Sequence, residues 1–170
     1  MGVDLVEWTF DPLQALNAHF NFSKLGVVVD QYEENAYGDS SSPLHHGSPT
    51  DRFVAKWTLS APHVQRRIAA RRVGRVRDAS VGASPLVNRA VSSGARLVPG
   101  EADLTLTERR LLVEIPGHYS EMLVGDAPLA LEWRLATRRI FTHYFARGYR
   151  AVDFFQAMDR SRGQYLLATT

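Results

Sequence analysis

Apolar and polar residues alternate near the start of the chain and then change to a helical spacing, which predicts a strand followed by a helix. Val6, Trp8 and Phe10 form the apolar face of the predicted strand, and its other face is mixed. Asp11 and Pro12 fit the cap and the first position of the helix, because an aspartate accepts hydrogen bonds from free N–H groups and proline needs none. The turn between strand and helix is therefore predicted to be short.

The predicted helix, residues 12–25, has a broad apolar stripe and a polar ridge. The apolar positions recur with the spacing of a helix packed on a sheet; they are Leu13, Ala15, Leu16, Ala18, Phe20, Phe22 and Leu25. Asn17, Asn21 and Lys24 are four and three residues apart, so they line up on the opposite side. Gly26 fits a left-handed helix end. The ridge is either a solvated helix face or the edge of a binding site, and its spacing alone favours the solvated face.

Two more strands are predicted at residues 27–32 and 51–59, separated by a polar stretch rich in serine, glycine and proline that we expect to be a long loop. Residues 61–100 differ in composition, with many arginines against Asp78 alone. We expect a helix from Pro62 to about Arg72, followed by an irregular connector that is disordered in part.

The last third repeats the earlier order of elements. Strands are predicted at residues 111–115, 149–155 and 164–168, and a strong helix runs from Pro128 to Gly148. We therefore predict an α/β fold with two strand-helix-strand-strand units, residues 1–60 and 106–170, joined by a basic connector at 61–105. The hypothesis is that both units contribute to one mixed, largely antiparallel sheet, or to two abutting sheets that share a core.

Composition limits the class of protein. With 170 residues, of which 45% are hydrophobic, the chain can bury one core or two small cores with a shared interface. It has no apolar run of membrane-spanning length, and residues 1–5 lack the features of a secretion signal, so we expect a cytoplasmic protein without membrane partners. The absence of cysteine excludes disulfides, thiolate metal sites and cysteine nucleophiles.

A family resemblance rests on the first 60 residues. The segment DPLQALNAHFNFSKLG, followed by a valine-rich strand, resembles the last conserved motif of the GNAT superfamily of acyl-CoA-dependent N-acyltransferases. It is similar to a group of predicted GNAT acetyltransferases, some with relatives associated with N-acylation, including N-succinylation, of amino acids. The positions that carry the closer similarity begin with the WTF before this segment and continue with Tyr32, Asn35, Tyr37, Gly38, Leu44, Gly47, Pro49, Asp51, Arg52, Phe53 and Trp57.

The resemblance implies a GNAT-like C-terminal half and a site for acetyl-CoA or another acyl-CoA. Asn17 and Asn21 match helix residues that face coenzyme A in such enzymes, where an amide can donate to and accept from the pantetheine amides. Lys24 completes the ridge of cofactor-binding candidates. The implied reaction is acetyl or succinyl transfer to a small-molecule amine, such as an amino acid.

Catalytic candidates follow from the same resemblance. Many GNAT enzymes place an acidic tyrosine near the middle of this helix, but Phe22 stands there, so the role is absent or moves to Tyr32 or Tyr37. Glu7, on the mixed face of the first strand, is a candidate base for a substrate ammonium group. The alternative for Glu7 is a structural partner for a neighbouring strand.

One expected motif is missing. GNAT enzymes hold the pyrophosphate with a Q/R-x-x-G-x-G/A loop before a helix, and no such segment precedes Val3. The segment at residues 71–76 departs from the pattern and has no strand before it. The resemblance therefore implies the C-terminal part of an acyltransferase with an incomplete cofactor site, for which a homo-oligomer or an N-terminal half would be the partner.

Other candidate sites have simpler interpretations. His45 and His46, with Asp39, Asp51 and His63, lack a defined ligand spacing, so we expect no metal. Glu33 and Glu34 in the polar loop are expected to be surface charge. A second set, consisting of Arg134, Arg138 and Arg139, has the chemistry to clamp a carboxylate or phosphate, but its helical spacing favours a solvated face.

Two other function classes stay open. The missing phosphate loop favours a non-catalytic small-molecule or protein-binding module. The arginines between Arg66 and Arg77 suggest a contact with nucleic acid, but they have no interleaved aromatic residues and the net charge is only +2, which makes this the weakest hypothesis.

Overall fold

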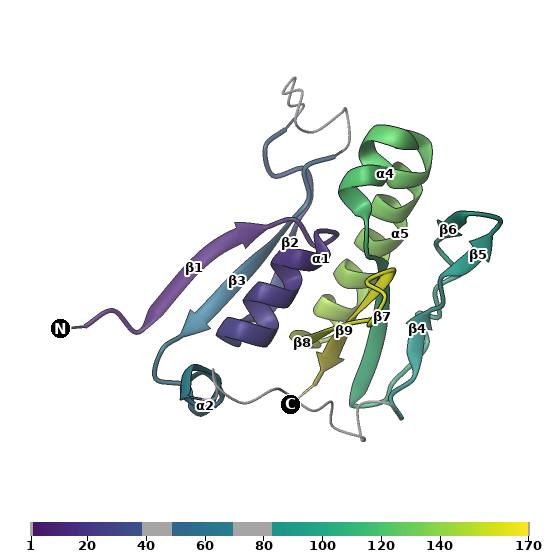
Figure 1. Ribbon diagram of the computed structural model, residues 1–170. Coiled ribbons are helices and arrows are strands. Elements are labelled where there is room, and N and C mark those ends of the chain that lie inside the picture. The colour runs from purple at the N-terminus through teal and green to yellow at the C-terminus, as the bar shows by residue number, and fades with distance from the viewer. Residues whose placement is uncertain (1, 39–48, 70–82, 170) are drawn as a thin grey trace.

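The computed structural model describes residues 2–38, 49–69 and 83–169. Seven strands form one sheet in the order β1-β3-β2-β8-β9-β7-β4 (Figure 1). Only the β4–β7 pair is parallel among these described strands, so the predicted mixed, largely antiparallel sheet is confirmed. The strands are β1 Leu5–Phe10, β2 Val28–Glu33, β3 Arg52–Thr58, β4 Leu86–Asn88, β7 Arg110–Pro116, β8 Arg150–Gln156 and β9 Arg162–Ala168.

The first unit has the predicted order of elements. Helix α1 (Ala15–Ala18) continues into the π-helix η1 (His19–Leu25), and β3 returns between β1 and β2. Gly26 has the predicted left-handed conformation, with φ 77°. The predicted helix start was wrong, because Asp11 caps a preceding turn, where its carboxylate accepts from the Leu13 N–H at 2.9 Å, and the helix begins at Ala15.

The predicted apolar stripe of this helix was only partly right. Ala15, Ala18 and Phe22 are buried, whereas Leu16 is 65% exposed and Phe20 54% exposed. A π-helix has more residues per turn than an α-helix, so side chains that an α-helical spacing would align drift around the axis within η1. The drift also separates the polar ridge, because Asn21 is only 4% exposed.

The second unit has the same topology as the first. It consists of β7, the helices α4 (Tyr119–Gly125) and α5 (Ala127–Ala146), and then β8 and β9, with β9 between β7 and β8. The units meet where β2 and β8 pair in antiparallel fashion, at Val29 and Ala151. Because the central strands are antiparallel and the strand orders are mirror images, an approximate two-fold rotation about the sheet normal relates the units.

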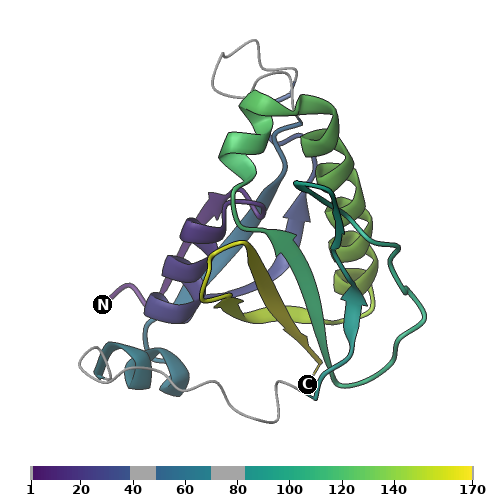
Figure 2. The same cartoon turned by 45° about the vertical axis from the view of Figure 1, so that its right-hand side comes forward.

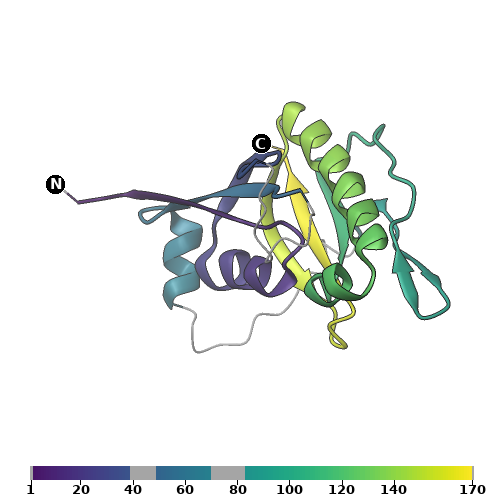
Figure 3. The same cartoon turned by 90° about the horizontal axis from the view of Figure 1, so that it is seen from above.

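The sheet is sharply bent where the units meet. Phe53 of β3 and Tyr165 of β9 lie three strand positions apart, which is about 14 Å in a flat sheet, yet their ring centroids are 5.4 Å apart. Phe22 of η1 contacts Tyr165, and Phe141 of α5 contacts both Phe53 and Tyr165. Figure 3 shows the two parts of the sheet at an angle to each other. The rings meet on the concave side, where they belong to one core shared by both units.

The segment between the units is more ordered than predicted. Helix α2 (Pro62–Ala69) forms as expected, but residues 86–98 are not irregular, because they contain β4 and a hairpin of β5 (Val91–Ser93) and β6 (Arg96–Val98). The chain then follows α5 back to β7, held by bonds such as that from the Tyr144 hydroxyl to the Asp103 carbonyl, 2.8 Å (Figure 2). No helix in the described part of the chain is long and apolar enough to cross a membrane.

The shared core predicts that the units unfold together. Replacing Phe53 by alanine removes a ring that contacts both units, and we expect a loss of about 3–5 kcal/mol of stability. Native-state hydrogen exchange should show equal loss of protection for amides in β3 and β9. Met158→Ala, at a fully exposed side chain, is the control and should change stability by less than about 0.5 kcal/mol. Loss of protection confined to β1, β2 and β3 would contradict a shared core.

Candidate functional site

Strand β1 has one open side. It pairs with β3 in the register Leu5–Thr58 to Phe10–Phe53, and within the described residues no strand pairs with its other side. The Leu59 N–H donates to the Asp4 carbonyl at 2.7 Å. Because backbone groups in an antiparallel pair alternate in direction, every second residue after Asp4 faces β3. The residues whose N–H and C=O groups face outward are therefore Leu5, Glu7 and Thr9.

Asn21, the middle residue of the predicted polar ridge, lies on the flank of the first helix next to β1. Trp8 of β1 donates its indole N–H to the Asn21 Oδ1 at 3.2 Å, while Ser23, on the other flank, donates to the Phe154 carbonyl of β8 at 3.0 Å. Asn17 and Lys24 lie four residues before and three after Asn21, and both are exposed. Asn17 lies about one turn before Asn21 and therefore near the same flank, whereas the π-helix turns Lys24 away from it, and Asn21 is a packing residue.

We call this place the β1 border: the outward backbone groups of Leu5, Glu7 and Thr9 together with the side chain of Asn17. Apolar side chains of β1 itself are exposed there, with Leu5 48% and Val6 37% exposed. A row of free backbone donors and acceptors beside apolar surface suits an extended ligand that carries amide groups, because such a ligand can pair with the strand as a neighbouring strand would. The side-chain amide of Asn17 on the helix adds a hydrogen-bond donor and an acceptor at one side of this row.

The catalytic candidates do not come together. Glu7 is exposed on β1, on the face opposite Trp8 and across from Lys56. Tyr37 is 57% exposed, and the guanidinium carbon of Arg52 lies 4.8 Å from its ring centroid. Tyr32 lies on the concave side of the sheet, stacked on Phe141. Of the three, only Glu7 belongs to an element of the β1 border.

Tyr32 is part of a polar network that sequence reasoning missed. Its hydroxyl donates to the Asp51 Oδ2 at 2.6 Å, and Arg138 of α5 donates to both carboxylate oxygens at 2.8 and 2.7 Å. The Asn35 N–H also donates to Asp51, at 2.9 Å. Burial, the Asp51 charge and this hydrogen bond raise the pKa of Tyr32 well above its ordinary value. The phenol therefore stays protonated and committed to Asp51.

A second buried ion pair lies one turn earlier on α5. Arg134, which is 1% exposed, donates to both oxygens of Asp11 at 2.8 and 2.7 Å. The prediction that Arg134 and Arg138 lie on a solvated face was wrong, whereas Arg139 is exposed. The carboxylates that these guanidinium groups clamp belong to Asp11 and Asp51 of the first unit. The paired acids are distant in sequence, which is why spacing along the helix did not reveal them.

The structure contains no metal-ligand group among the described residues. Of the histidines and acids considered from the sequence, His63 contacts the Gly26 carbonyl through Nε2 at 3.0 Å, and Asp51 is held by Arg138. Glu34 also pairs with Arg138, at 3.3 Å. Asp39, His45, His46 and most of the arginine-rich segment lie outside the described residues.

Comparisons with protein-family models, curated proteins and solved structures gave no match.

The Arg134–Asp11 pair predicts a large loss of stability when one partner is removed. Arg134→Met leaves the Asp11 carboxylate without its bidentate partner, and breaking a buried pair in this way costs about 3–5 kcal/mol. Lys56→Met, which breaks the exposed 2.6 Å pair with Asp30, is the matched control and should cost less than about 1 kcal/mol. Urea unfolding measures both, and equal losses would show that the buried pair has no special role.

Asp51 predicts a pH dependence of stability. Burial pushes its pKa upward, but the bonds from Arg138, Tyr32 and the Asn35 N–H outweigh this effect, so its pKa lies below the ordinary value. The carboxylate therefore contributes stability above the unfolded-state pKa of about 3.9. That contribution is lost as the pH falls through the lower, folded-state pKa.

The Asp51→Asn variant should accordingly be less stable than the wild type at pH 6, and the difference should shrink as the pH falls below about 4. The measurement is the free energy of unfolding in urea across this range. A difference that stays constant with pH would contradict the assignment.

Proposed function

We propose that the chain takes part in acyl-CoA-dependent N-acyl transfer and that the β1 border binds the pantetheine arm of the cofactor. The observation that carries this proposal is the free edge of β1 beside the helix flank that holds Asn21 and, about one turn earlier, Asn17. The strand and helix that carry the GNAT resemblance thus also form a surface that can hydrogen-bond to the amides of the cofactor. The given sequence contains no Q/R-x-x-G-x-G/A segment, so we expect weak binding of acyl-CoA by this chain.

The chemistry of the pantetheine arm fits the β1 border. The arm is extended and contains two amides, each with one donor and one acceptor. The outward N–H and C=O groups of Leu5, Glu7 and Thr9 offer both kinds of partner along the strand. Asn17 can complete a bond to one amide from the side. Exposed Leu5 and Val6 offer apolar contact to the methylene groups between the amides.

In the proposed reaction the amine nitrogen attacks the thioester carbonyl, the carbon–sulfur bond breaks, and the thiolate leaves with a proton. An ammonium substrate must first lose a proton, and Glu7 is the acid side chain on the strand that would hold the thioester. Tyr32 is poorly suited as the acid that protonates the thiolate, because its proton is held in the bond to Asp51. Tyr37 remains the tyrosine candidate for that step.

Binding is tested by titrating the full, nitrogen-15-labelled chain with coenzyme A and following its amide resonances. We expect the largest shifts at the outward residues of β1 and at Asn17. Asn17→Ala removes one neutral hydrogen bond, worth about 1 kcal/mol, and should weaken binding roughly fivefold. Gln31→Ala removes an exposed amide on β2, away from the border, and is the matched control. Shifts elsewhere, or an affinity unchanged in Asn17→Ala, would overturn the proposal.

A non-catalytic binding module is the second candidate, and the committed hydroxyl of Tyr32 favours it. The two functions are separated by incubating the chain with acetyl-CoA or succinyl-CoA and a panel of amino acids, and measuring free thiol. Thiol release that requires the amine and is lost in Glu7→Gln supports the transferase. Binding at the β1 border without amine-dependent release supports the module.

A further inference from the structure

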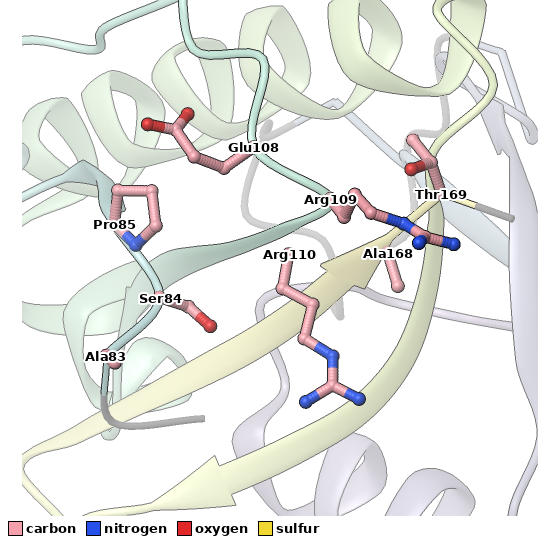
Figure 4. A pocket seen from close by; sticks show the side chains of 8 residues that line it. All are labelled: Ala83, Ser84, Pro85, Glu108, Arg109, Arg110, Ala168 and Thr169. Carbon is pink, nitrogen blue, oxygen red and sulfur yellow. The ribbon is translucent and has the colours of Figure 1, made fainter. Parts of the chain in front are cut away.

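A cavity lies toward the end of the sheet away from β1. Its volume is about 650 Å³, and it opens to solvent. Residues 83–85 before β4, residues 108–110 at the start of β7, and Ala168 and Thr169 at the end of β9 form its walls (Figure 4). We call it the arginine cavity, because Arg109 and Arg110 are its cationic residues. It shares no residue with the β1 border.

The charge in the arginine cavity is not neutralised by its own acid. Glu108 accepts the Thr107 N–H at 3.0 Å, and its carboxylate points away from the guanidinium groups of Arg109 and Arg110 (Figure 4). Among the described residues, Arg109 forms no ion pair. Arg109 therefore presents positive charge to a ligand in the cavity.

The strand register adds a third arginine next to the cavity. Ala168 of β9 is paired with Arg110 of β7 on one side and with Arg150 of β8 on the other. Paired residues point to the same face of a sheet, so the two arginines flank a position that holds only a methyl group. Their Cα atoms are two strand spacings, or about 10 Å, apart. Two guanidinium groups on flexible stems can converge over this gap on one phosphate or carboxylate.

Apolar residues border the charged row. Two positions further along their strands, Leu112 and Leu166 are paired, and they pack with Leu86 of β4 on the face that Arg110 shares. Pro85, which directly precedes Leu86 in the sequence, is part of the cavity wall. A ligand whose anionic group sits between the arginines would place its remaining atoms against Pro85 and Leu86. The pattern fits an anion that carries an apolar group better than a bare inorganic ion.

We propose that the arginine cavity binds a small organic anion, with one phosphate or carboxylate held by Arg110 and its neighbours and a short apolar group held against Pro85 and Leu86. The site is distinct from the proposed cofactor surface and does not depend on the proposed function. Phosphate and carboxylate share the recognising chemistry, so the test compares them.

The test titrates the full chain with octyl phosphate, octanoate, inorganic phosphate and octyl glucoside, followed by amide resonances. We expect saturable binding of octyl phosphate or octanoate, with shifts at residues 83–85, 108–110 and 168–169. Inorganic phosphate should bind at least tenfold more weakly. Octyl glucoside, which has the same tail and no charge, should give no saturable shift there. Equal binding of octyl glucoside, or no saturable binding of either octyl anion, would overturn the proposal.

Two variants separate charge from shape. Arg110→Gln should weaken binding of the better octyl anion about tenfold, the effect of losing one charge-assisted hydrogen bond. Ala168→Leu keeps every arginine but fills the gap between Arg110 and Arg150, and should weaken binding by a similar factor. Arg139→Gln, an exposed arginine on α5, is the matched control for charge. Equal weakening in Arg139→Gln, or full affinity in both cavity variants, would contradict a defined site; circular dichroism confirms that each variant is folded.

Discussion

The aromatic packing inside the bent sheet is the interaction on which the rest of the structure depends. Backbone pairing between the units is short, since β2 and β8 are matched only at Val29 and Ala151. The rings of Phe53, Phe141 and Tyr165 meet on the concave side with centroids about 5 Å apart. Aromatic side chains bury a large apolar area and need no strand register. They can therefore hold the two units together although few backbone hydrogen bonds join β2 to β8.

Two ion pairs fix the position of α5 on the first unit. Arg134 and Arg138 are one turn apart on the helix, and they reach Asp11 after β1 and Asp51 before β3. A buried charge is costly without its partner, so these pairs disfavour other positions of the helix over the aromatic core. Their second effect is on function, because they commit Asp51 and, through it, Tyr32 to structure. The surfaces left for ligands lie at the margins of the sheet.

Those margins differ in chemistry. The β1 border offers a free strand edge and one helix amide, which suit an uncharged, extended chain of amides. The arginine cavity offers guanidinium groups beside apolar residues, which suit an anion. Both surfaces arise from the same topology. In each unit the last strand lies between the first two, so the first strand, β1 or β7, is the one farthest from the β2–β8 pair where the units meet. In the second unit, β4 then covers part of that outward strand and forms one wall of the cavity.

The sequence by itself determined the strands and the main helix of each unit and their order, because alternation, helical spacing and the glycine after each of these helices are local signals. It also determined the polar ridge as a candidate, through Asn17, Asn21 and Lys24. Only the tertiary structure decided that η1 is a π-helix that turns Asn21 inward, that Arg134 and Arg138 bind Asp11 and Asp51, and that Ala168 lies between two arginines. The two ion pairs join residues 123 and 87 positions apart, and the position of Ala168 depends on strand register. No local pattern carries that information, since burial and pairing are set by which surfaces meet when the units pack.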